Sequence, residues 1–190
     1  MAIPQVLCAE VRLKQMLMQL SYKKGTFKLT SGKESDFYVD GKKTVLDGEG
    51  SFLVGTCFYS MIRRIYPDAQ AVAGVTLGAD PLVTATSLIA FQRGSSLPQI
   101  IIRKERKNHG TGNQLEEAAT VPKNANIILL DDVLTTGGTL LKIGIPALER
   151  AGHKILAILV VVDREEGGRQ ALEGCGYGVQ SILTRTELLA

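Results

Sequence analysis

The sequence has few of the features that mark secreted, membrane-bound or metal-clustered proteins. Its three cysteines, Cys8, Cys57 and Cys175, are odd in number and far apart, so they indicate neither a disulfide framework nor a metal-binding motif. The N-terminus has no long apolar segment of the kind found in signal peptides. The longest apolar run, residues 155–162, is too short to span a bilayer. We therefore expect a soluble, cytoplasmic protein with no membrane partner.

The chain also has little net charge. The 190 residues include 22 lysines and arginines against 19 aspartates and glutamates, which gives a net charge of +3. Basic residues are not spread along the chain as nucleic-acid binding usually requires, so we expect no nucleic-acid partner. A hydrophobic content of 45% is typical of globular proteins, and a chain of this length can bury a core. We predict a single domain over residues 1–190.

The first part of the chain predicts a small N-terminal unit, which we call the hood (residues ~1–45). Apolar residues at helical spacing predict a helix over residues 6–20, which Gly25 is expected to end. Alternating residues predict short strands at residues 27–30 and 37–39. We expect these elements to cover a site on the rest of the chain rather than to form a second domain.

From residue 50 onward, predicted strands and helices alternate. This order favours an α/β fold with a mostly parallel central sheet flanked by helices. The near-continuous runs of Ile, Leu and Val suit strands that are buried on both faces. A long polar loop is predicted at residues 104–117. Strands are predicted at residues 71–75, 99–103, 127–130, 154–162 and 179–183, and helices at residues 50–65, 81–91, 139–151 and 168–173.

The most informative segment is residues 127–140, in which an apolar strand ends in two acids, Asp131 and Asp132. A short loop of hydroxyl and glycine residues follows, and a helix then begins. Ligands of open α/β sheets bind at the carboxyl ends of the strands, and glycines at a helix N-terminus let the backbone approach a phosphate. The acids would repel that phosphate, so we expect them to face sugar hydroxyls or hydrated Mg²⁺. The segment thus predicts a site for a phosphorylated sugar.

Three other interpretations of this segment compete with a sugar-phosphate site. An ordinary acidic turn before a capped helix is disfavoured by the full order of strand, acids, hydroxyls, glycines and helix. A P-loop requires Gly-Lys-Ser/Thr, whereas residues 137–139 are Gly-Gly-Thr. A dinucleotide site requires Gly-x-Gly-x-x-Gly early in the fold, and no such motif opens a helix here. The segment instead resembles the phosphoribosyl pyrophosphate signature of the type I phosphoribosyltransferases, which does not specify the nucleobase.

A second segment, residues 103–112, is rich in cations, follows a predicted strand and ends in glycines. The simplest interpretation is a solvated charged loop. The functional interpretation is a mobile lid whose cations neutralise a departing pyrophosphate, and so stabilise the transition state more than the ground state. A closed lid would also keep water away from the reactive carbon.

The basic segment resembles the catalytic loop of the orotate phosphoribosyltransferases, and residues 27–40 and 162–168 resemble two further parts of that family. Three motifs in register, spread over nearly the whole chain, make the resemblance specific. It implies a type I phosphoribosyltransferase fold and transfer of a phosphoribosyl group from phosphoribosyl pyrophosphate to orotate. It also implies Mg²⁺ as cofactor and a homodimer in which the lid reaches the neighbouring subunit's site.

The resemblance also implies roles for individual residues. Lys107 and His109 are the implied catalytic contacts to the charge that builds on pyrophosphate. No direct protein ligand to the metal is implied, although Asp131 and Asp132 are candidates for contact through water. The implied substrate-binding residues are Arg103, Lys104, Lys107 and His109 at pyrophosphate, Asp131, Asp132, Val133, Leu134, Thr135, Thr136, Gly137, Gly138 and Thr139 at ribose 5-phosphate, and Thr135 and Arg164 at orotate.

Simpler interpretations stand beside these roles. Arg164 could form only a surface ion pair with Glu165 or Glu166, and His109 could lie at a loop tip without a role. A purine phosphoribosyltransferase, or a regulator that binds phosphoribosyl pyrophosphate without catalysis, would share the segment at residues 127–140.

The chain departs from the family pattern at two positions. Thr30 and Leu77 stand where some members of the family carry a lysine. Lys42 and Lys43 follow the predicted strands of the hood and are candidates to compensate, although a solvated pair is an equally good interpretation. The departures bear on affinity and geometry, and they leave the class of reaction unchanged.

Overall fold

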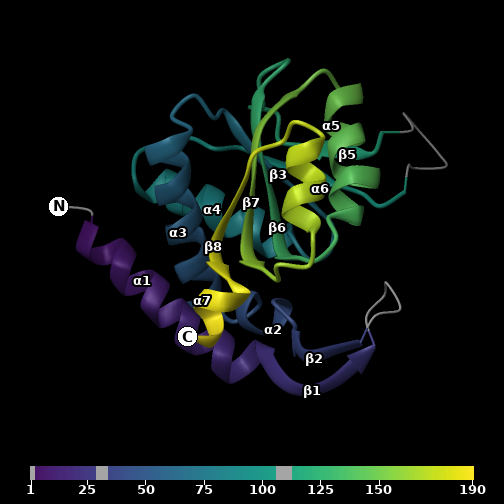
Figure 1. The fold of residues 1–190 in the computed structure, drawn as a ribbon. Helices are drawn as coiled ribbons and strands as arrows, with labels where there is room; N and C mark the ends of the chain where they lie inside the picture. The colour runs from purple at the N-terminus through teal and green to yellow at the C-terminus, as the bar shows by residue number, and fades with distance from the viewer. Residues whose placement is uncertain (1–2, 29–33, 106–112) are drawn as a thin grey trace.

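The computed structural model of this chain describes residues 3–28, 34–105 and 113–190 (Figure 1). Its centre is a six-stranded sheet in the order β5-β4-β3-β6-β7-β8. All neighbouring strands are parallel except β5, which pairs antiparallel with β4 at one edge. The mostly parallel sheet predicted from the sequence is confirmed. The strands are β3 (Ala71–Val75), β4 (Gln99–Ile102), β5 (Leu115–Glu117), β6 (Asn126–Leu134), β7 (Lys154–Asp163) and β8 (Val179–Thr184).

Helices cover both faces of this sheet, as the buried strands require. Figure 1 shows α3 and α4 on one side of it and α5 and α6 on the other. The four helices predicted from residue 50 onward are confirmed, although the one after the glycine loop begins with a π-helical turn, η2. The short helices α2 and α7 were not predicted, because four or five residues show no helical periodicity. The helices are α1 (Ile3–Met16), η1 (Leu17–Ser21), α2 (Lys42–Val45), α3 (Gly48–Ile65), α4 (Asp80–Gln92), η2 (Leu140–Gly144), α5 (Ile145–Arg150), α6 (Gly168–Gly174) and α7 (Arg185–Leu189).

The hood contains an antiparallel hairpin of β1 (Tyr22–Lys28) and β2 (Glu34–Val39). The helix predicted at residues 6–20 is confirmed, but the expectation that Gly25 ends it is wrong, because the helix ends at Ser21 and Gly25 lies inside β1. The chain becomes extended at Tyr22, whose ring stacks on that of Phe37 at 6.4 Å between centroids. Pairing across the hairpin therefore overrides the turn preference of the glycine.

One predicted strand and one predicted loop need correction. β6 continues past residue 130 to Leu134, so the acid pair lies within the strand rather than after it. The added residues pair with β7 alone, since the pairing with β3 stops at Leu130. The predicted loop at residues 104–117 contains the short edge strand β5, in which Leu115 pairs with Ile102.

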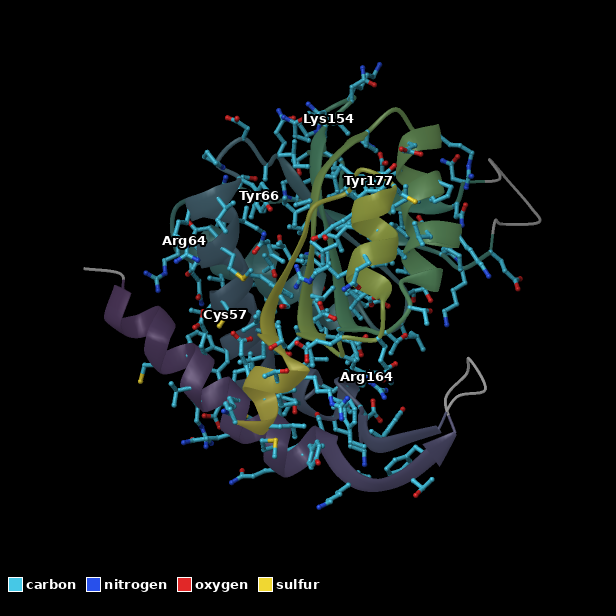
Figure 2. All side chains as sticks on the ribbon, viewed as in Figure 1. Cys57, Arg64, Tyr66, Lys154, Arg164 and Tyr177 are labelled. Carbon is cyan, nitrogen blue, oxygen red and sulfur yellow. The ribbon has the colours of Figure 1, made fainter. Side chains whose placement is uncertain are left out.

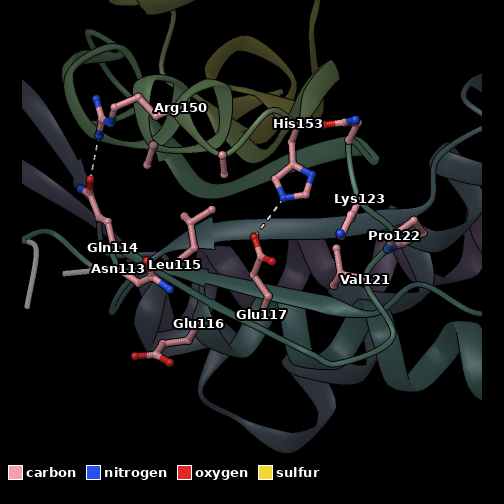
Figure 3. A pocket seen from close by; sticks show the side chains of 13 residues that line it. Asn113, Gln114, Leu115, Glu116, Glu117, Val121, Pro122, Lys123, Arg150 and His153 are labelled. Atoms are coloured by element: carbon pink, nitrogen blue, oxygen red, sulfur yellow. Dashed lines mark hydrogen bonds and ion pairs between the residues drawn. The ribbon is translucent and has the colours of Figure 1, made fainter. Parts of the chain in front are cut away.

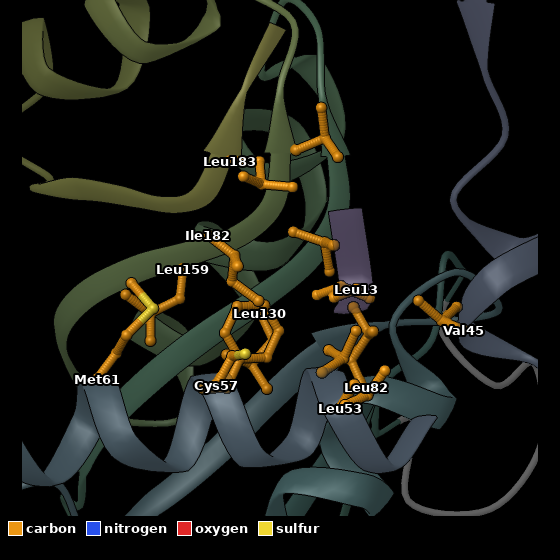
Figure 4. Packing of buried hydrophobic residues seen from close by; sticks show 14 of the residues in the cluster. Leu13, Val45, Leu53, Cys57, Met61, Leu82, Leu130, Leu159, Ile182 and Leu183 are labelled. Carbon is orange, nitrogen blue, oxygen red and sulfur yellow. The ribbon is translucent and has the colours of Figure 1, made fainter. Parts of the chain in front are cut away.

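The larger of two hydrophobic clusters joins the hood to the sheet. Figure 4 shows side chains from α1, α3, α4, β6, β7 and β8 meeting in it, among them Leu13, Cys57, Leu130 and Ile182. Cys57 is fully buried, and burial raises the pKa of its thiol to about 12, which leaves it protonated and unreactive at neutral pH. Within the described ranges, no helix is both long and apolar enough to cross a membrane.

The hood is also held by a close backbone approach between α2 and α3, which predicts the effect of a substitution. A Cβ at Gly50 would lie 2.0 Å from the carbonyl oxygen of Thr44, whereas a Cβ at Gly48 would meet nothing within 4 Å. We expect Gly50→Ala to lower the free energy of unfolding by about 1–3 kcal/mol, because backbone must move. Gly48→Ala is the matched control and should be neutral or stabilising. Urea unfolding of both variants tests this, and equal stabilities would contradict it.

Candidate active site

The acid pair lies on the part of β6 that extends beyond its pairing with β3. The backbone N–H of Asp132 donates to Oδ1 of Asp131 at 3.0 Å, and that of Val133 donates to Oδ1 of Asp132 at 2.9 Å. The two carboxylates have different neighbours, although they are close enough to act on each other. Asp131 borders a pocket with the glycine loop, whereas the Asp132 carboxylate comes close to Gly41 and Gly78.

Both glycines beside Asp132 belong to other elements. A Cβ at Gly41, which precedes α2, would lie 3.1 Å from Oδ2 of Asp132, and a Cβ at Gly78 would lie 3.3 Å from Oδ1. The loop between β3 and α4, which contains Gly78 and a cis peptide bond between Thr76 and Leu77, is thus placed next to the acids. The hood, β6 and this loop meet at one point.

The electrostatics of the acid pair are unbalanced. Burial, and to a smaller extent the neighbouring charge of Asp132, together raise the pKa of Asp131 to about 7. The charge of Lys42 acts in the opposite direction and lowers the pKa of Asp131. Nζ of Lys42 lies 3.1 Å from Oδ1 of Asp40. The pKa of Lys42 is raised, chiefly by its hydrogen bond to Asp40 and to a smaller extent by the charge of Asp132. Lys42 therefore lies close enough to the acids to act on them electrostatically.

The predicted sugar-phosphate segment lines one pocket of about 370 Å³. In its loop, Gly137 has a φ of +74°, a conformation that favours glycine. The backbone N–H of Gly168 donates to the carbonyl of Thr135 at 2.9 Å, and a Cβ at Gly168 would lie 2.4 Å from that oxygen. The lining residues are Asp131, Val133, Leu134, Thr135, Thr136, Gly137, Gly138, Thr139, Lys142 and Ile143. All predicted residues of this segment except Asp132 thus lie around a single hollow.

Arg164 follows β7 and lies beside the hood. Figure 2 shows it at the end of the sheet opposite Lys154, where β7 begins. Its side chain is 2% exposed, and its guanidinium lies 4.6 Å from the ring centroid of Phe37 and 2.7 Å from Oε1 of Glu166. The predicted alternative of an ion pair with Glu166 is thus present in the structure, although Arg164 is buried and Glu166 is only partly exposed. Arg164 thus lies at the carboxyl ends of the strands, where ligands of such sheets bind, and a guanidinium is suited to binding planar anions.

The first residues of the basic segment, Arg103 and Lys104, also lie at the carboxyl ends of the strands, because they follow β4, which is two strands away from β6. Arg103 follows β4, and its backbone N–H donates to the carbonyl of Gln114 at 2.9 Å. Its side chain forms a 2.8 Å ion pair with Glu116. Lys104 is exposed. Lys107 and His109 lie outside the described residues.

A larger hollow of about 830 Å³ lies along β5 and α5, and it contains none of the predicted site residues. Figure 3 shows that its polar side chains face one another, with His153 paired to Glu117 at 2.9 Å and Arg150 donating to Gln114 at 2.8 Å. Nδ1 of His153 also accepts from the backbone N–H of Ala125. These mutual contacts join the edge strand to the body of the fold, so the smaller pocket is the better candidate for a ligand site.

The sequence reasoning missed three residues near the candidate site. Lys142 lines the pocket from the first turn of the helix after the loop, and its position three residues beyond Thr139 is the signal that could have found it. Phe37 was assigned only to a strand, yet its ring lies against Arg164. Arg185 lies 4.4 Å from the centroid of the same ring, and no motif in the sequence marks it.

Comparison with known proteins agrees with this geometry. A family model described as the phosphoribosyl transferase domain matches residues 54–182. This range contains the whole sheet up to β8 and the pocket-lining loop. The fold and the site thus define the chain as a phosphoribosyltransferase.

Curated relatives narrow the class to one family. The orotate phosphoribosyltransferase of Nostoc sp. is 37% identical over 177 residues, which cover 93% of this chain and 84% of that protein. The enzyme of that name from Thermococcus gammatolerans is 41% identical over 165 residues, with 87% and 83% covered. A crystal structure of Mycobacterium tuberculosis orotate phosphoribosyltransferase has a TM-score of 0.76 and 30% identity over 95% of this chain and 98% of that one. The chain belongs to the orotate phosphoribosyltransferase family.

The unbalanced acid pair predicts a pH dependence of stability. A carboxyl whose pKa is raised in the folded state stabilises that state below its unfolded pKa, and this contribution is lost as the pH rises toward 7. We expect Asp131→Asn, which keeps an oxygen acceptor for Asp132, to raise the free energy of unfolding above pH 7 by about 1–4 kcal/mol. Below pH 4 the variant and the wild type should be similar. Urea unfolding of the ligand-free protein at pH 4, 6 and 8 tests this, and a pH-independent difference would contradict it.

Proposed function

We propose that this protein transfers the phosphoribosyl group of phosphoribosyl pyrophosphate to N1 of orotate, giving orotidine 5′-monophosphate and pyrophosphate, a step of pyrimidine biosynthesis. The observation that carries the proposal is the meeting of two features at the carboxyl ends of β6 and β7. One is a pocket lined by hydroxyls and glycines, and the other is the buried Arg164. The first suits the phosphate of a sugar, and the second suits the planar carboxylate of orotate.

The protein supplies positioning and charge in this mechanism, and no protein nucleophile is needed. The bond from ribose C1 to the pyrophosphate oxygen breaks, a bond from C1 to N1 of orotate forms, and the proton on N1 passes to the departing pyrophosphate or to solvent. Residues 135–139 hold the 5-phosphate through their amides and hydroxyls, while Asp131 and Asp132 face the ribose hydroxyls. Arg103, Lys104, Lys107 and His109 face the departing pyrophosphate, where cations stabilise the growing charge. Arg103 must exchange its ion pair with Glu116 for this contact.

The residues of the site fit a requirement for Mg²⁺. The pKa of Asp131 is raised by burial and then by the charge of Asp132, so a nearby cation would favour its ionised form, and hard cations prefer carboxylate oxygens. No three His, Cys, Asp or Glu side chains gather for full coordination in the described ranges. We infer that Asp131 and Asp132 would hold the ion through water. Bound there, Mg²⁺ neutralises charge and orients the leaving group.

We also infer the assembly and setting of the enzyme. Residues ~1–45 act as a hood over the base site within a single domain, which the contact of Phe37 with Arg164 supports. The protein is a cytoplasmic homodimer in which the lid of one subunit reaches the site of the other. The three cysteines are free, in keeping with a reducing compartment.

The activity test follows the loss of orotate absorbance with phosphoribosyl pyrophosphate and Mg²⁺. We expect turnover with orotate that a chelator abolishes and added Mg²⁺ restores. A panel of uracil, adenine and hypoxanthine should give no comparable product. Faster transfer to a purine would instead support the purine enzyme, and binding of phosphoribosyl pyrophosphate without pyrophosphate release would support the regulator.

The role of the lid predicts the effect of Lys107→Ala. Removal of one preorganised charge donor costs on the order of 3 kcal/mol of transition-state stabilisation, so turnover should fall about a hundredfold or more. Lys123→Ala is a matched control, because this lysine lies in the other, larger hollow. Steady-state rates with orotate test the prediction. Near-normal turnover in Lys107→Ala would remove the lid from the mechanism.

Sharing of the lid between subunits predicts complementation. Lys107→Ala and Arg164→Leu should each be inactive alone, because each removes a different part of the site. Unfolded and refolded together, they should regain about a quarter of wild-type activity, since half of the mixed dimers are hybrids and each hybrid holds one intact site. Refolding each variant alone is the control. No recovery despite hybrid dimers on native mass spectrometry would place the lid over its own subunit's site.

A further inference from the structure

Two arginines from different elements lie against one aromatic ring at the base site. The guanidinium carbons of Arg164 and Arg185 lie 4.6 Å and 4.4 Å from the ring centroid of Phe37. Both distances are within the range of cation–π attraction, which is stronger where the groups are shielded from water. Phe37 is 2% exposed, and so is Arg164. The ring therefore links the C-terminal helix α7 to the arginine that the proposed function assigns to orotate.

The topology of the sheet brings the two arginines together. Asp163, the last residue of β7, is paired with Thr184, the last residue of β8. Arg164 and Arg185 are the next residues of these two parallel strands, so both leave the sheet at the same level. Figure 1 shows α7 at this end of the sheet, next to the hood. The juxtaposition is thus set by strand register rather than by a chance meeting of surface side chains.

A second contact fixes α7 to the segment that carries Arg164. Oε2 of Glu165 accepts hydrogen bonds from the backbone N–H of Thr186 at 3.0 Å and from its hydroxyl at 2.7 Å. Glu165 has a φ of +58°, an uncommon value for a residue other than glycine, so its backbone is held by its surroundings. Its own N–H donates to Oδ1 of the buried Asp163.

The start of α7 is itself well defined. Thr184 and Glu187 form a capping box, in which each side chain binds the backbone N–H of the other residue. Leu188 is 2% exposed and packs into the larger hydrophobic cluster. A capped and anchored helix holds its first residue, Arg185, in one place, so Arg185 can in turn restrict the position of Phe37.

We propose that Arg185 is a positioning residue for recognition of the base, and that α7 is part of the orotate site. Arg185 holds the ring of Phe37, which in turn lies against the Arg164 guanidinium. Thr186 holds Glu165, the residue that follows Arg164 in the backbone. Glu166 holds one side of the Arg164 guanidinium at 2.7 Å, and the ring of Phe37 lies 4.6 Å from its central carbon. This inference rests on the proposed function, because it assumes that Arg164 binds the carboxylate of orotate.

The test compares two product nucleotides that differ only in the carboxylate. Calorimetry measures the affinity of the wild type, Arg185→Leu and Arg185→Lys for orotidine 5′-monophosphate and uridine 5′-monophosphate. We expect Arg185→Leu to weaken binding of the first nucleotide about fivefold to thirtyfold, the range of a shielded cation–π contact, and to leave binding of the second unchanged. Arg185→Lys keeps the charge without the planar group and should lie between. The KM for orotate should rise in parallel, while the KM for phosphoribosyl pyrophosphate stays the same.

Controls separate positioning from folding and from the choice of base. Arg12→Leu removes an exposed guanidinium that pairs with Glu49 and should change neither affinity. Thr186→Val, which keeps the backbone bond to Glu165, should weaken binding of orotidine 5′-monophosphate less than Arg185→Leu. Equal weakening for both nucleotides in Arg185→Leu, or no change for either, overturns the inference. A wild type that binds the two nucleotides equally and does not use orotate overturns the proposed function instead.

Discussion

Backbone hydrogen bonds that continue beyond the sheet between β6 and β7 hold the whole site together. The N–H of Arg164 donates to the carbonyl of Leu134 at 3.0 Å, and the N–H of Gly168 donates to that of Thr135 at 2.9 Å. These bonds fix the segment that carries Arg164 against the loop that lines the pocket. The relative position of the pocket and of the segment that carries Arg164 is therefore set by main-chain contacts. Gly168 is required at this point, since a side chain there would collide with Thr135.

The same arrangement explains why the acids are poorly compensated. β6 outruns β3 by four residues, so its last part has a neighbour on one side only. Asp131 and Asp132 occupy this extension, where burial and mutual repulsion raise the pKa of Asp131. The charged form of Asp131 is therefore unfavourable in the free protein, and a ligand that brings hydroxyl donors and a cation would stabilise it. The stability lost by burying the acids is thus available to favour binding.

The sequence predicted the elements that show as runs of similar residues. It did not predict strand ends and short strands that depend on pairing with a neighbouring strand. Strands β3, β6 and β7 were found because burial on both faces makes them continuously apolar. The end of β6 was placed four residues early because Asp131 and Asp132 do not look like strand residues, and pairing with β7 overrides that preference. Similarly, β5 holds only one apolar residue, Leu115, and its pairing with β4 is not visible in the sequence. A loop before a helix was predicted from the glycines and hydroxyls at residues 135–139, and the structure has a loop there that lines a pocket.

The cations around the site show the limit of motif reasoning most clearly. Leu77, which stands where some relatives carry a lysine, is 76% exposed and offers no charge to the acids beside it. Cations instead lie nearby on elements that the family motifs do not mark: Lys42 of α2 near the acids, Lys142 of η2 at the pocket, and Arg185 of α7 against Phe37. A binding site for an anion requires positive potential at a place, and long side chains from several elements can supply it. Position in space is therefore a better guide than position in a motif for finding which residues this chain uses.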